Sequence, residues 1–322
     1  MSISRTLLHD ISHLLTTIYS PGEASAVARL LLSRGVGWGT VAVFTGKDSD
    51  LSTDERRRLR DFLHRLLDLR EPVQYVLGEA PFCGRDFVVR PGVLIPRPET
   101  EQLLEMLKAD GLPDGKCPPR LLDVGTGSGC IAVIMALLFP SARVEAWDIS
   151  EAALQVAREN ARRHGVEVAF RRCDLLQEAA VDAALCDRSA GAFAESAGTS
   201  TEEARHFSGA SAAGGAAYAA LVSNPPYVLP SEEAAMQPEV CKWEPREALF
   251  VPADDPLLPY RALCRIGRKR LADGGKMYLE INPLLAAQVE ELLRDAGFGE
   301  VRLVEDFAKK QRFIIGTNHL LC

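Results

Sequence analysis

From residue 120 onward the chain alternates short apolar runs with longer amphipathic stretches, and this alternation restricts the fold more than any other feature. The runs have the length of buried strands, and the stretches between them have the length of helices. Strands are expected at 121–124, 144–147, 166–171, 221–223, 276–281, 301–304 and 313–316. Because such alternation builds right-handed strand–helix–strand units, we expect an α/β fold with a mostly parallel sheet and helices on both faces.

The first 72 residues follow a different pattern, in which apolar side chains recur at helical spacing. Ser20 to Glu23 reads as a capping box, with a proline at the first helical position. Another helix is expected from Ser52 to Leu69, and Pro72 prevents it from continuing. We therefore predict a small helical domain over residues 1–72.

Residues 73–97 are expected to connect this domain to the α/β domain, which we place at 98–322. Val73 to Leu77 and Phe87 to Val89 have strand-like composition, and Gly78 and Gly84 lie between them. A β-hairpin is therefore predicted for the connection. A helix should follow it, from near Glu99 to about Ala109.

Residues 179–220 interrupt the alternation, because alanine, glycine and serine dominate them. Such a segment buries too little apolar surface to offset its ordering entropy. We expect a flexible surface insertion within the α/β domain. A partner-binding arm is the alternative.

Charge and cysteine usage exclude several classes of function. The net charge is −7 and the pI is about 5.5, so the chain lacks the basic footprint of a nucleic-acid binder, and no stable nucleic-acid binding is expected. None of the eight cysteines lies in a C-x-x-C pair, so no metal site is expected. Scattered thiols suit a reducing compartment. With no signal peptide and no membrane-spanning run recognised, we expect a cytoplasmic protein that acts as a monomer.

A glycine-rich turn follows the first expected strand of the α/β domain and opens a helix. It reads G-x-G-x-G from Gly125 to Gly129, which differs from the G-x-G-x-x-G fingerprint of dinucleotide-binding folds. Asp148 ends the next strand and is placed to accept hydrogen bonds from two ribose hydroxyls. Asp174 follows the third strand, where it could accept from an adenine amino group while Leu175 packs on the ring. The combination favours S-adenosyl-L-methionine over a dinucleotide, the alternative being a tight turn with a helix-capping aspartate.

The sequence Asn224-Pro225-Pro226-Tyr227 directly follows the fourth strand. Ligands of open α/β sheets bind outside the carboxyl ends of the strands. The Asn224 side-chain oxygen and the Pro225 carbonyl could accept both N–H bonds of a planar NH2 group and so orient its nitrogen toward a methyl donor. The two prolines stiffen the loop, and Tyr227 offers an aromatic face. The alternative is a rigid proline turn.

Taken together, these segments resemble the HemK-type peptide-chain release factor glutamine methyltransferases. The resemblance rests on Gln74 to Gly78, Phe82 to Gly84, Leu94 to Glu101, Gly125 to Gly129, Ser223 to Tyr227, Glu244 to Leu249, Tyr260-Arg261 and Glu280-Ile281. It covers nearly the whole chain from residue 70 and is weaker before it. It implies a class I, Rossmann-like methyltransferase fold.

The resemblance also implies a substrate, which is the glutamine of the Gly-Gly-Gln loop in class I release factors, methylated on its side-chain nitrogen (N5). The helical domain would help to dock the release factor. The pattern and the match together assign cofactor binding to Gly125, Thr126, Gly127, Ser128, Gly129, Asp148, Asp174, Leu175 and Asn224. Asn224, Pro225, Pro226 and Tyr227 would bind the glutamine, with Asn224, Pro225 and Tyr227 as the catalytic group.

Several points stay open in the sequence. Arg97, Glu99 and Thr100 would form part of the wall near the donor, although Arg97 and Glu99 could instead be a surface ion pair. The chain departs from the family in its long insertion, and in Asn282-Pro283, where the family tends to have glycine; we expect neither to alter the chemistry. An N6-adenine methyltransferase that acts on a flipped base in DNA or RNA is the competing function, and a cofactor-binding scaffold without activity is a further alternative.

Overall fold

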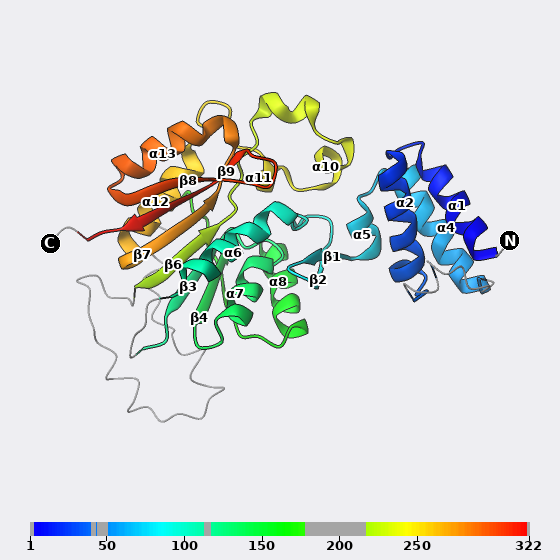
Figure 1. Ribbon diagram of the computed structural model, residues 1–322, viewed down its shortest axis with the longest axis horizontal. Coiled ribbons are helices and arrows are strands. Elements are labelled where there is room, and N and C mark those ends of the chain that lie inside the picture. The colour runs from blue at the N-terminus through cyan, green and yellow to red at the C-terminus, as the bar shows by residue number, and fades with distance from the viewer. Residues whose placement is uncertain (1–2, 40–42, 44–50, 113–116, 178–216, 321–322) are drawn as a thin grey trace. The chain divides into compact units, whose positions relative to one another are not determined.

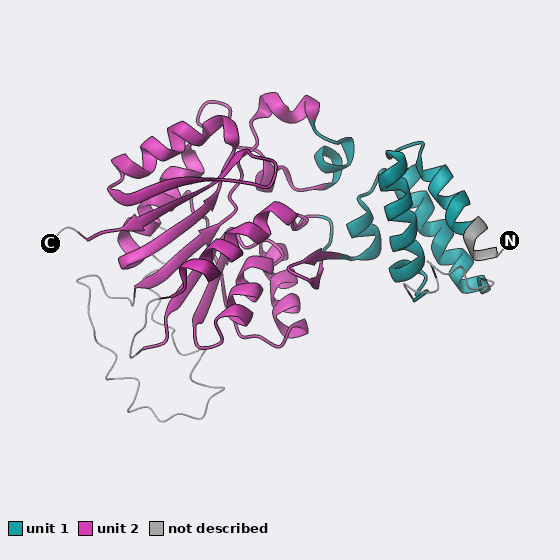
Figure 2. Cartoon of the chain, in the orientation of Figure 1, with its two compact units in different colours: residues 1–79, 89–91, 236–243 teal, residues 80–88, 92–235, 244–322 magenta. Residues whose placement is uncertain are grey.

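A computed structural model of the chain describes residues 3–39, 43, 51–112, 117–177 and 217–320. The chain divides into two compact units (Figure 2). Unit 1 comprises residues 1–79, 89–91 and 236–243, and unit 2 comprises residues 80–88, 92–235 and 244–322. Across the described ranges, no helix is both long enough and apolar enough to cross a membrane.

Unit 1 is helical, as its apolar spacing predicts. Its elements are α1 (Ile3–Leu15), α2 (Pro21–Leu30), the π-helical turn Leu31–Gly35, α4 (Thr53–Leu67), α5 (Val73–Leu77) and α10 (Pro238–Trp243). The capping box at Ser20 and Glu23 is confirmed, and Ser52 and Glu55 form a second one at the start of α4. Buried side chains of these helices, among them Leu15, Leu31 and Leu66, form one core.

The strand prediction for Val73 to Leu77 is wrong, because these residues form the short helix α5. Two interactions within unit 1 outweigh the strand propensity of valine and tyrosine. Arg65 donates to the carbonyls of Tyr75 and Val76 and is itself held by the buried carboxylate of Glu71. Gly78, in the left-handed conformation at φ 76°, then ends the helix.

The segment that carries α10 is joined to unit 1 by hydrogen bonds at the end of α4. Lys242 Nζ donates to the Leu69 carbonyl over 2.9 Å, and Trp243 Nε1 donates to the same oxygen over 3.2 Å. Arg70 forms an ion pair with Glu239. Unit 1 therefore includes residues that follow the fourth strand of the α/β sheet by more than a dozen positions.

Unit 2 contains the α/β sheet (Figure 1). Seven strands lie in the order β5-β4-β3-β6-β7-β9-β8, and β9 alone runs opposite in direction to the other six. The strands are β3 (Arg120–Val124), β4 (Arg143–Asp148), β5 (Ala169–Arg172), β6 (Tyr218–Ser223), β7 (Leu271–Glu280), β8 (Phe298–Glu305) and β9 (Gln311–Asn318). The predicted α/β class with a mostly parallel sheet is confirmed.

Several predicted strand boundaries change, among them the start of the fifth strand, which is Leu271 and not Lys276. The third strand begins at Ala169, not at Val166, and the fourth begins at Tyr218, not at Leu221. Residues 218–220 therefore belong to the sheet and not to the insertion, because the Tyr218 hydroxyl donates to buried Glu145 and Ala220 pairs with β3. Residues 179–216 of the predicted insertion lie outside the described part of the chain.

Helices cover both faces of the sheet. They are α6 (Glu101–Asp110), α7 (Cys130–Leu138), α8 (Glu151–Arg163), α12 (Leu258–Arg270) and α13 (Ala286–Asp295), with short helical turns at Pro98–Thr100, Pro230–Ala235, Arg246–Leu249 (α11) and Pro283–Leu285. Successive residues of a strand direct their side chains to opposite faces of the sheet. Leu121, Val222 and Tyr278 pack in the core with α6 and α7, whereas Leu221 and Met277 pack with α12 and α13.

The predicted hairpin is present, but at β1 (Glu79–Phe82) and β2 (Arg85–Val88). Phe82 and Phe87 are fully buried and meet edge to face, with ring centroids 5.9 Å apart. Buried Asn160 of α8 exchanges hydrogen bonds with both backbone groups of Val88 and donates to the carbonyl of Ser128. The hairpin is therefore fixed to α8 and to the glycine-rich turn.

Gly129 packs directly against Ala157 of α8. It is the N-cap of α7 at φ 81°, a left-handed conformation that favours glycine. A Cβ atom at this position would lie 2.8 Å from the Cβ and 2.9 Å from the Cα of Ala157. Neither atom can move without moving α8, so the contact requires glycine.

We expect Gly129→Ala to lower the free energy of unfolding by roughly 2–5 kcal/mol, which combines the left-handed backbone cost with overpacking. Gly165→Ala is the matched control, because Gly165 has φ 66° but no heavy atom would lie within 4 Å of a Cβ added there. Urea denaturation of both variants measures the difference. Equal losses for the two variants would contradict the packing argument.

Candidate functional site

The register of the parallel strands brings four sequence positions to one edge of the sheet. Val124 lies opposite both Trp147 and Ser223, and Ser223 lies opposite Leu279. The residues that follow these are Gly125, Asp148, Asn224 and Glu280. Each of them therefore stands at the carboxyl end of its strand, where α/β sheets bind ligands.

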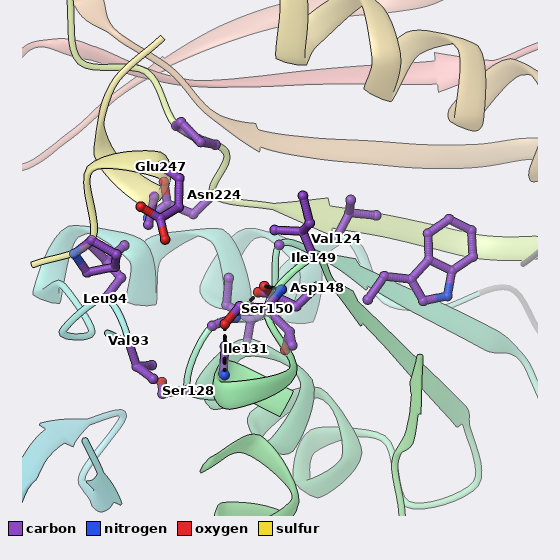
Figure 3. A pocket seen from close by; sticks show the side chains of 18 of the residues that line it. Val93, Leu94, Val124, Ser128, Ile131, Asp148, Ile149, Ser150, Asn224 and Glu247 are labelled. Atoms are coloured by element: carbon purple, nitrogen blue, oxygen red, sulfur yellow. Dashed lines mark hydrogen bonds between the residues drawn. The ribbon is translucent and has the colours of Figure 1, made fainter. Parts of the chain in front are cut away.

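A cavity of about 240 Å³ opens at this edge. In Figure 3, Asn224 and Glu247 lie at one side of it, and Asp148 and Ser150 lie at another. Its lining includes Val93, Leu94, Pro96, Arg97, Thr100, Gly125, Thr126, Gly127, Ser128, Asp148, Ile149, Asp174, Leu175, Leu176, Asn224, Pro226, Pro245, Glu247 and Ala248. Most of the residues that the sequence assigns to a cofactor thus face one space.

The glycine-rich turn is held rigidly beneath this cavity. The backbone N–H groups of Gly125 and Thr126 both donate to the Trp147 carbonyl, over 2.8 and 2.9 Å. The Thr126 hydroxyl donates to Asp123 over 2.5 Å, and the same carboxylate oxygen accepts from Ala132 N. Burial raises the pKa of Asp123 to about 7. These bonds fix the turn against β3 and β4 before any ligand arrives.

Asp148 extends the same network. Its two carboxylate oxygens accept from Gly127 N over 2.8 Å and from Ser150 N over 2.9 Å. Burial raises the pKa of Asp148, and the two backbone donors oppose that shift. Ser150 accepts from Ala153 N and caps α8. The carboxylate keeps further lone pairs available on the cavity side.

The wall beside Asp148 combines carboxylates with exposed apolar side chains. Asp174 accepts from Leu176 N over 2.9 Å and lines the cavity together with Leu175. Ile149 is 50% exposed and Leu176 is 45% exposed, although both are large aliphatic residues. Exposed aliphatic groups beside carboxylates suit a ligand that is flat and apolar on its faces and polar at its edges.

Two residues of the turn differ in their placement. Ser128 lines the cavity, and its buried Oγ has no hydrogen-bond partner among the described residues. A buried polar atom without a partner marks a position where a polar ligand would be stabilised. Gly129 is not among the lining residues, and its position is explained by the contact between α7 and α8.

The Asn224 to Tyr227 segment is divided between the cavity and the protein interior. Asn224 and Pro226 line the cavity, whereas Pro225 and Tyr227 are not among the lining residues. The Tyr227 hydroxyl donates to Glu280 over 2.8 Å, and the Arg312 guanidinium lies 5.9 Å from the centre of its ring. Burial raises the pKa of Tyr227, so the hydroxyl keeps its proton.

Asn282, at which the sequence departs from the family pattern, forms hydrogen bonds to this segment and to the loop that follows it. Its Nδ2 donates to the Tyr227 carbonyl over 3.0 Å and to Glu232 over 2.6 Å. Glu232 in turn accepts from Leu229 N. A glycine could form neither side-chain bond, so this chain braces the loop after Tyr227 in its own way.

Thr100 and Glu280 connect Asn224 with Tyr227, the first and last residues of this segment, through a chain of hydrogen bonds. Asn224 Nδ2 donates to Thr100 Oγ1 over 3.0 Å, and the Thr100 hydroxyl donates to Glu280 Oε2 over 2.6 Å. Glu280 is 1% exposed, and burial raises its pKa. The sequence assigned no role to Glu280. Its signal was a carboxylate at the end of an otherwise apolar strand, at the same edge as Asp148 and Asn224.

Arg97 pairs with Glu244 and not with Glu99. The Arg97 guanidinium lies 2.6 Å from Glu244 Oε1, and Ile95 N donates to the other carboxylate oxygen over 3.1 Å. Glu244 is 4% exposed. This pair attaches the segment before α6 to the segment before α11, so that Pro96 and Pro245 form adjoining parts of the cavity wall.

The strand order, the glycine-rich turn after β3 and the carboxylate that ends β4 together define a class I methyltransferase. A family model described as a methyltransferase domain matches residues 119–206, and one described as the PrmC N-terminal domain matches residues 6–78. Several proteins that are similar to this chain over most of its length share one name, release factor glutamine methyltransferase. A release factor glutamine methyltransferase of Bacteroides thetaiotaomicron is 38% identical, over 93% of this chain and 95% of its own length.

A second relative with that name, from Chlorobaculum tepidum, is 38% identical over 90% of this chain and 89% of its own length. A third, from Neisseria gonorrhoeae, is 34% identical over 90% and 92%. The chain belongs to the family of release factor glutamine methyltransferases. Among solved structures, a methyltransferase from Pyrococcus furiosus is 14% identical with a TM-score of 0.45, over 82% of this chain and 99% of that one.

We expect Glu244→Ala to lower the free energy of unfolding by about 1–3 kcal/mol, because Ile95 N and Arg97 lose their buried acceptor. Glu233→Ala is the matched control, since Glu233 pairs with Arg246 at the exposed surface, where an ion pair contributes about 0–1 kcal/mol. Thermal unfolding monitored by circular dichroism compares the two. A loss no larger for Glu244 than for Glu233 would rule out a structural role for the pair.

Proposed function

We propose that this chain transfers a methyl group from S-adenosyl-L-methionine to the side-chain amide nitrogen (N5) of the glutamine in the Gly-Gly-Gln motif of class I release factors. Family membership supports the reaction class. The observation that carries the proposal for this chain is the placement of Asn224. Its amide lies on the cavity wall with Nδ2 bonded to Thr100, so its oxygen remains free to accept from a substrate NH2 group.

The cavity suits the cofactor chemically. Gly125, Gly127 and Ser128 offer close backbone approach and an unpaired buried hydroxyl. Asp148 and Asp174 offer carboxylate acceptors for ribose and adenine, between the aliphatic side chains of Ile149, Leu175 and Leu176. When bound, the cofactor supplies an electrophilic methyl group, whose S–C bond breaks as the N–C bond forms, and the methylated nitrogen then loses a proton to water.

The chain's own contribution to the transfer is positioning. An amide nitrogen is a weak nucleophile, because its lone pair is delocalised. Asn224 Oδ1 and the Pro225 carbonyl would each accept one of its N–H bonds and so direct the lone pair toward the donor. Holding reactants in this way can account for about 7–11 kcal/mol of barrier reduction in favourable cases. A general base is not required, since the proton leaves after the transfer.

Two further roles belong to the proposal. Tyr227 would act through its hydrogen bond to Glu280, which orients the loop, in addition to any contact of its ring with the substrate. Unit 1 would dock the release factor outside the Gly-Gly-Gln loop, a role supported by the match of its residues 6–78 to a domain named for this family.

Labelled donor offered to a release factor and to duplex DNA in parallel tests the proposed acceptor. We expect label in the release factor, lost when its Gly-Gly-Gln glutamine is replaced by alanine, and none in the DNA. The reason is that the acidic chain lacks the charge that binds phosphates. Label in the nucleic acid alone would refute the proposal.

Asn224→Ala should reduce turnover below detection while the dissociation constant of the cofactor changes by less than about tenfold, the equivalent of one hydrogen bond. Single-turnover assays and isothermal titration calorimetry measure the two quantities. Glu151→Ala serves as the control, because Glu151 is exposed on α8 and pairs only with Arg158 among the contacts described. Turnover that survives in Asn224→Ala would remove this residue from the mechanism.

A further inference from the structure

A buried carboxylate stands behind the substrate-facing asparagine without reaching the cavity itself. Glu280 ends β7, is 1% exposed and is not among the lining residues. Its two oxygens accept from two hydroxyls, Thr100 Oγ1 over 2.6 Å and Tyr227 OH over 2.8 Å. Among the described residues, no lysine or arginine forms an ion pair with it. A charge buried in this way is costly unless it is well hydrogen-bonded, so its retention calls for a reason.

Burial raises the pKa of Glu280, whereas its two hydroxyl donors and the nearby Arg312 guanidinium favour the ionised form. In that form the carboxylate imposes one direction on the hydrogen bonds around it. A carboxylate can only accept, whereas a hydroxyl has one proton to donate and lone pairs to accept with. Thr100 therefore gives its only proton to Glu280 and turns a lone pair toward Asn224. That lone pair can be met only by the NH2 end of the Asn224 amide, which lies 3.0 Å away.

The consequence appears at the far end of the amide. With Nδ2 committed to Thr100, Asn224 Oδ1 is the end left for a substrate. If the amide were rotated by 180°, two lone pairs would face each other at Thr100, and the cavity would present a donor to a substrate NH2 group. The orientation of the Asn224 amide thus depends on Glu280, to which it is connected through two hydrogen bonds.

We propose that Glu280 is a positioning residue, which acts through Thr100 to hold the Asn224 amide with its oxygen toward the acceptor nitrogen and through Tyr227 to hold the same loop at its other end. This inference rests on the proposed function for its catalytic consequence. The orientation of the Asn224 amide can be measured without it.

Glu280→Gln tests the proposal with the shape preserved, in the full-length protein. The glutamine places an NH2 group against one of the two hydroxyls, so that hydroxyl must accept and can turn its proton elsewhere. If it is Thr100, its proton can point at Asn224 and favour the rotated amide. If it is Tyr227, the loop that carries Asn224 loses the hydrogen bond that holds its other end. We expect kcat with a release factor to fall about tenfold or more, as for other misplaced reacting groups. KM and the dissociation constant of S-adenosylhomocysteine should stay within about threefold, since Glu280 does not line the cavity.

A spectroscopic readout examines the amide itself. The side-chain NH2 signals of Asn224 in asparagine-labelled protein are assigned by their absence in Asn224→Ala. We expect Glu280→Gln to shift them and to speed their exchange with water, because the bond to Thr100 is weakened. Unchanged shifts and exchange rates would overturn the proposal, as would a kcat equal to that of the unaltered protein.

Thr100 variants keep the test decisive if Glu280→Gln unfolds. Thr100→Ser keeps the hydroxyl and should retain kcat within about threefold, whereas Thr100→Val keeps the shape without the hydroxyl and should lose about tenfold or more. Equal kcat values for Thr100→Ser and Thr100→Val would refute a role for the Thr100 hydroxyl in orienting Asn224. Asp110→Asn is the control for loss of a carboxylate that accepts from a tyrosine hydroxyl, because Asp110 accepts from Tyr278 and does not line the cavity.

The design separates the two proposals. If the unaltered protein fails to methylate a release factor, the proposed function fails, and the Asn224 signals still decide whether Glu280 orients the amide. If the unaltered protein methylates the release factor while the glutamine and valine variants match it, only the positioning role fails.

Discussion

The site depends on the backbone pairing of four parallel strands that end level with one another. The registers of β3 with β4, of β3 with β6, and of β6 with β7 place Gly125, Asp148, Asn224 and Glu280 in one row. No side chain has to create this proximity. A shift of one residue in any pairing would carry a site residue out of the row and turn its strand's core side chains to the wrong face.

Patterns with a strong local cause could be predicted from the sequence. The strand–helix alternation, the glycine-rich turn before α7 and the capping box at Ser20 all follow from neighbouring residues. Val73 to Leu77 could not be predicted, because its conformation depends on Arg65 of the adjacent helix α4, which Glu71 holds in place. The start of β6 was also missed, since pairing with β3 and β7 extends it into an alanine-rich stretch.

In the candidate site, too, the residues with a local signal could be predicted and those without one could not. Residues in contiguous motifs, such as Asp148 and Asn224, were identified, and all but Gly129, Pro225 and Tyr227 line the cavity. Pairs of residues that are distant in sequence could not be identified. Arg97 meets Glu244 across 147 positions, and Thr100 meets Glu280 across 180. A single sequence contains no signal that connects such pairs. Their partners were visible only as charged residues inside otherwise apolar surroundings.

The two units are interlaced along the chain. Residues 236–243 belong to the helical unit, although they lie between the fourth and fifth strands of the sheet. No single cut of the backbone therefore separates the units. During synthesis the helical unit cannot be completed until four strands of the seven-stranded sheet have left the ribosome. Removing the first 79 residues would leave Lys242 and Trp243 without the Leu69 carbonyl to which both donate, so the unit boundary is a property of contacts rather than of a position in the sequence.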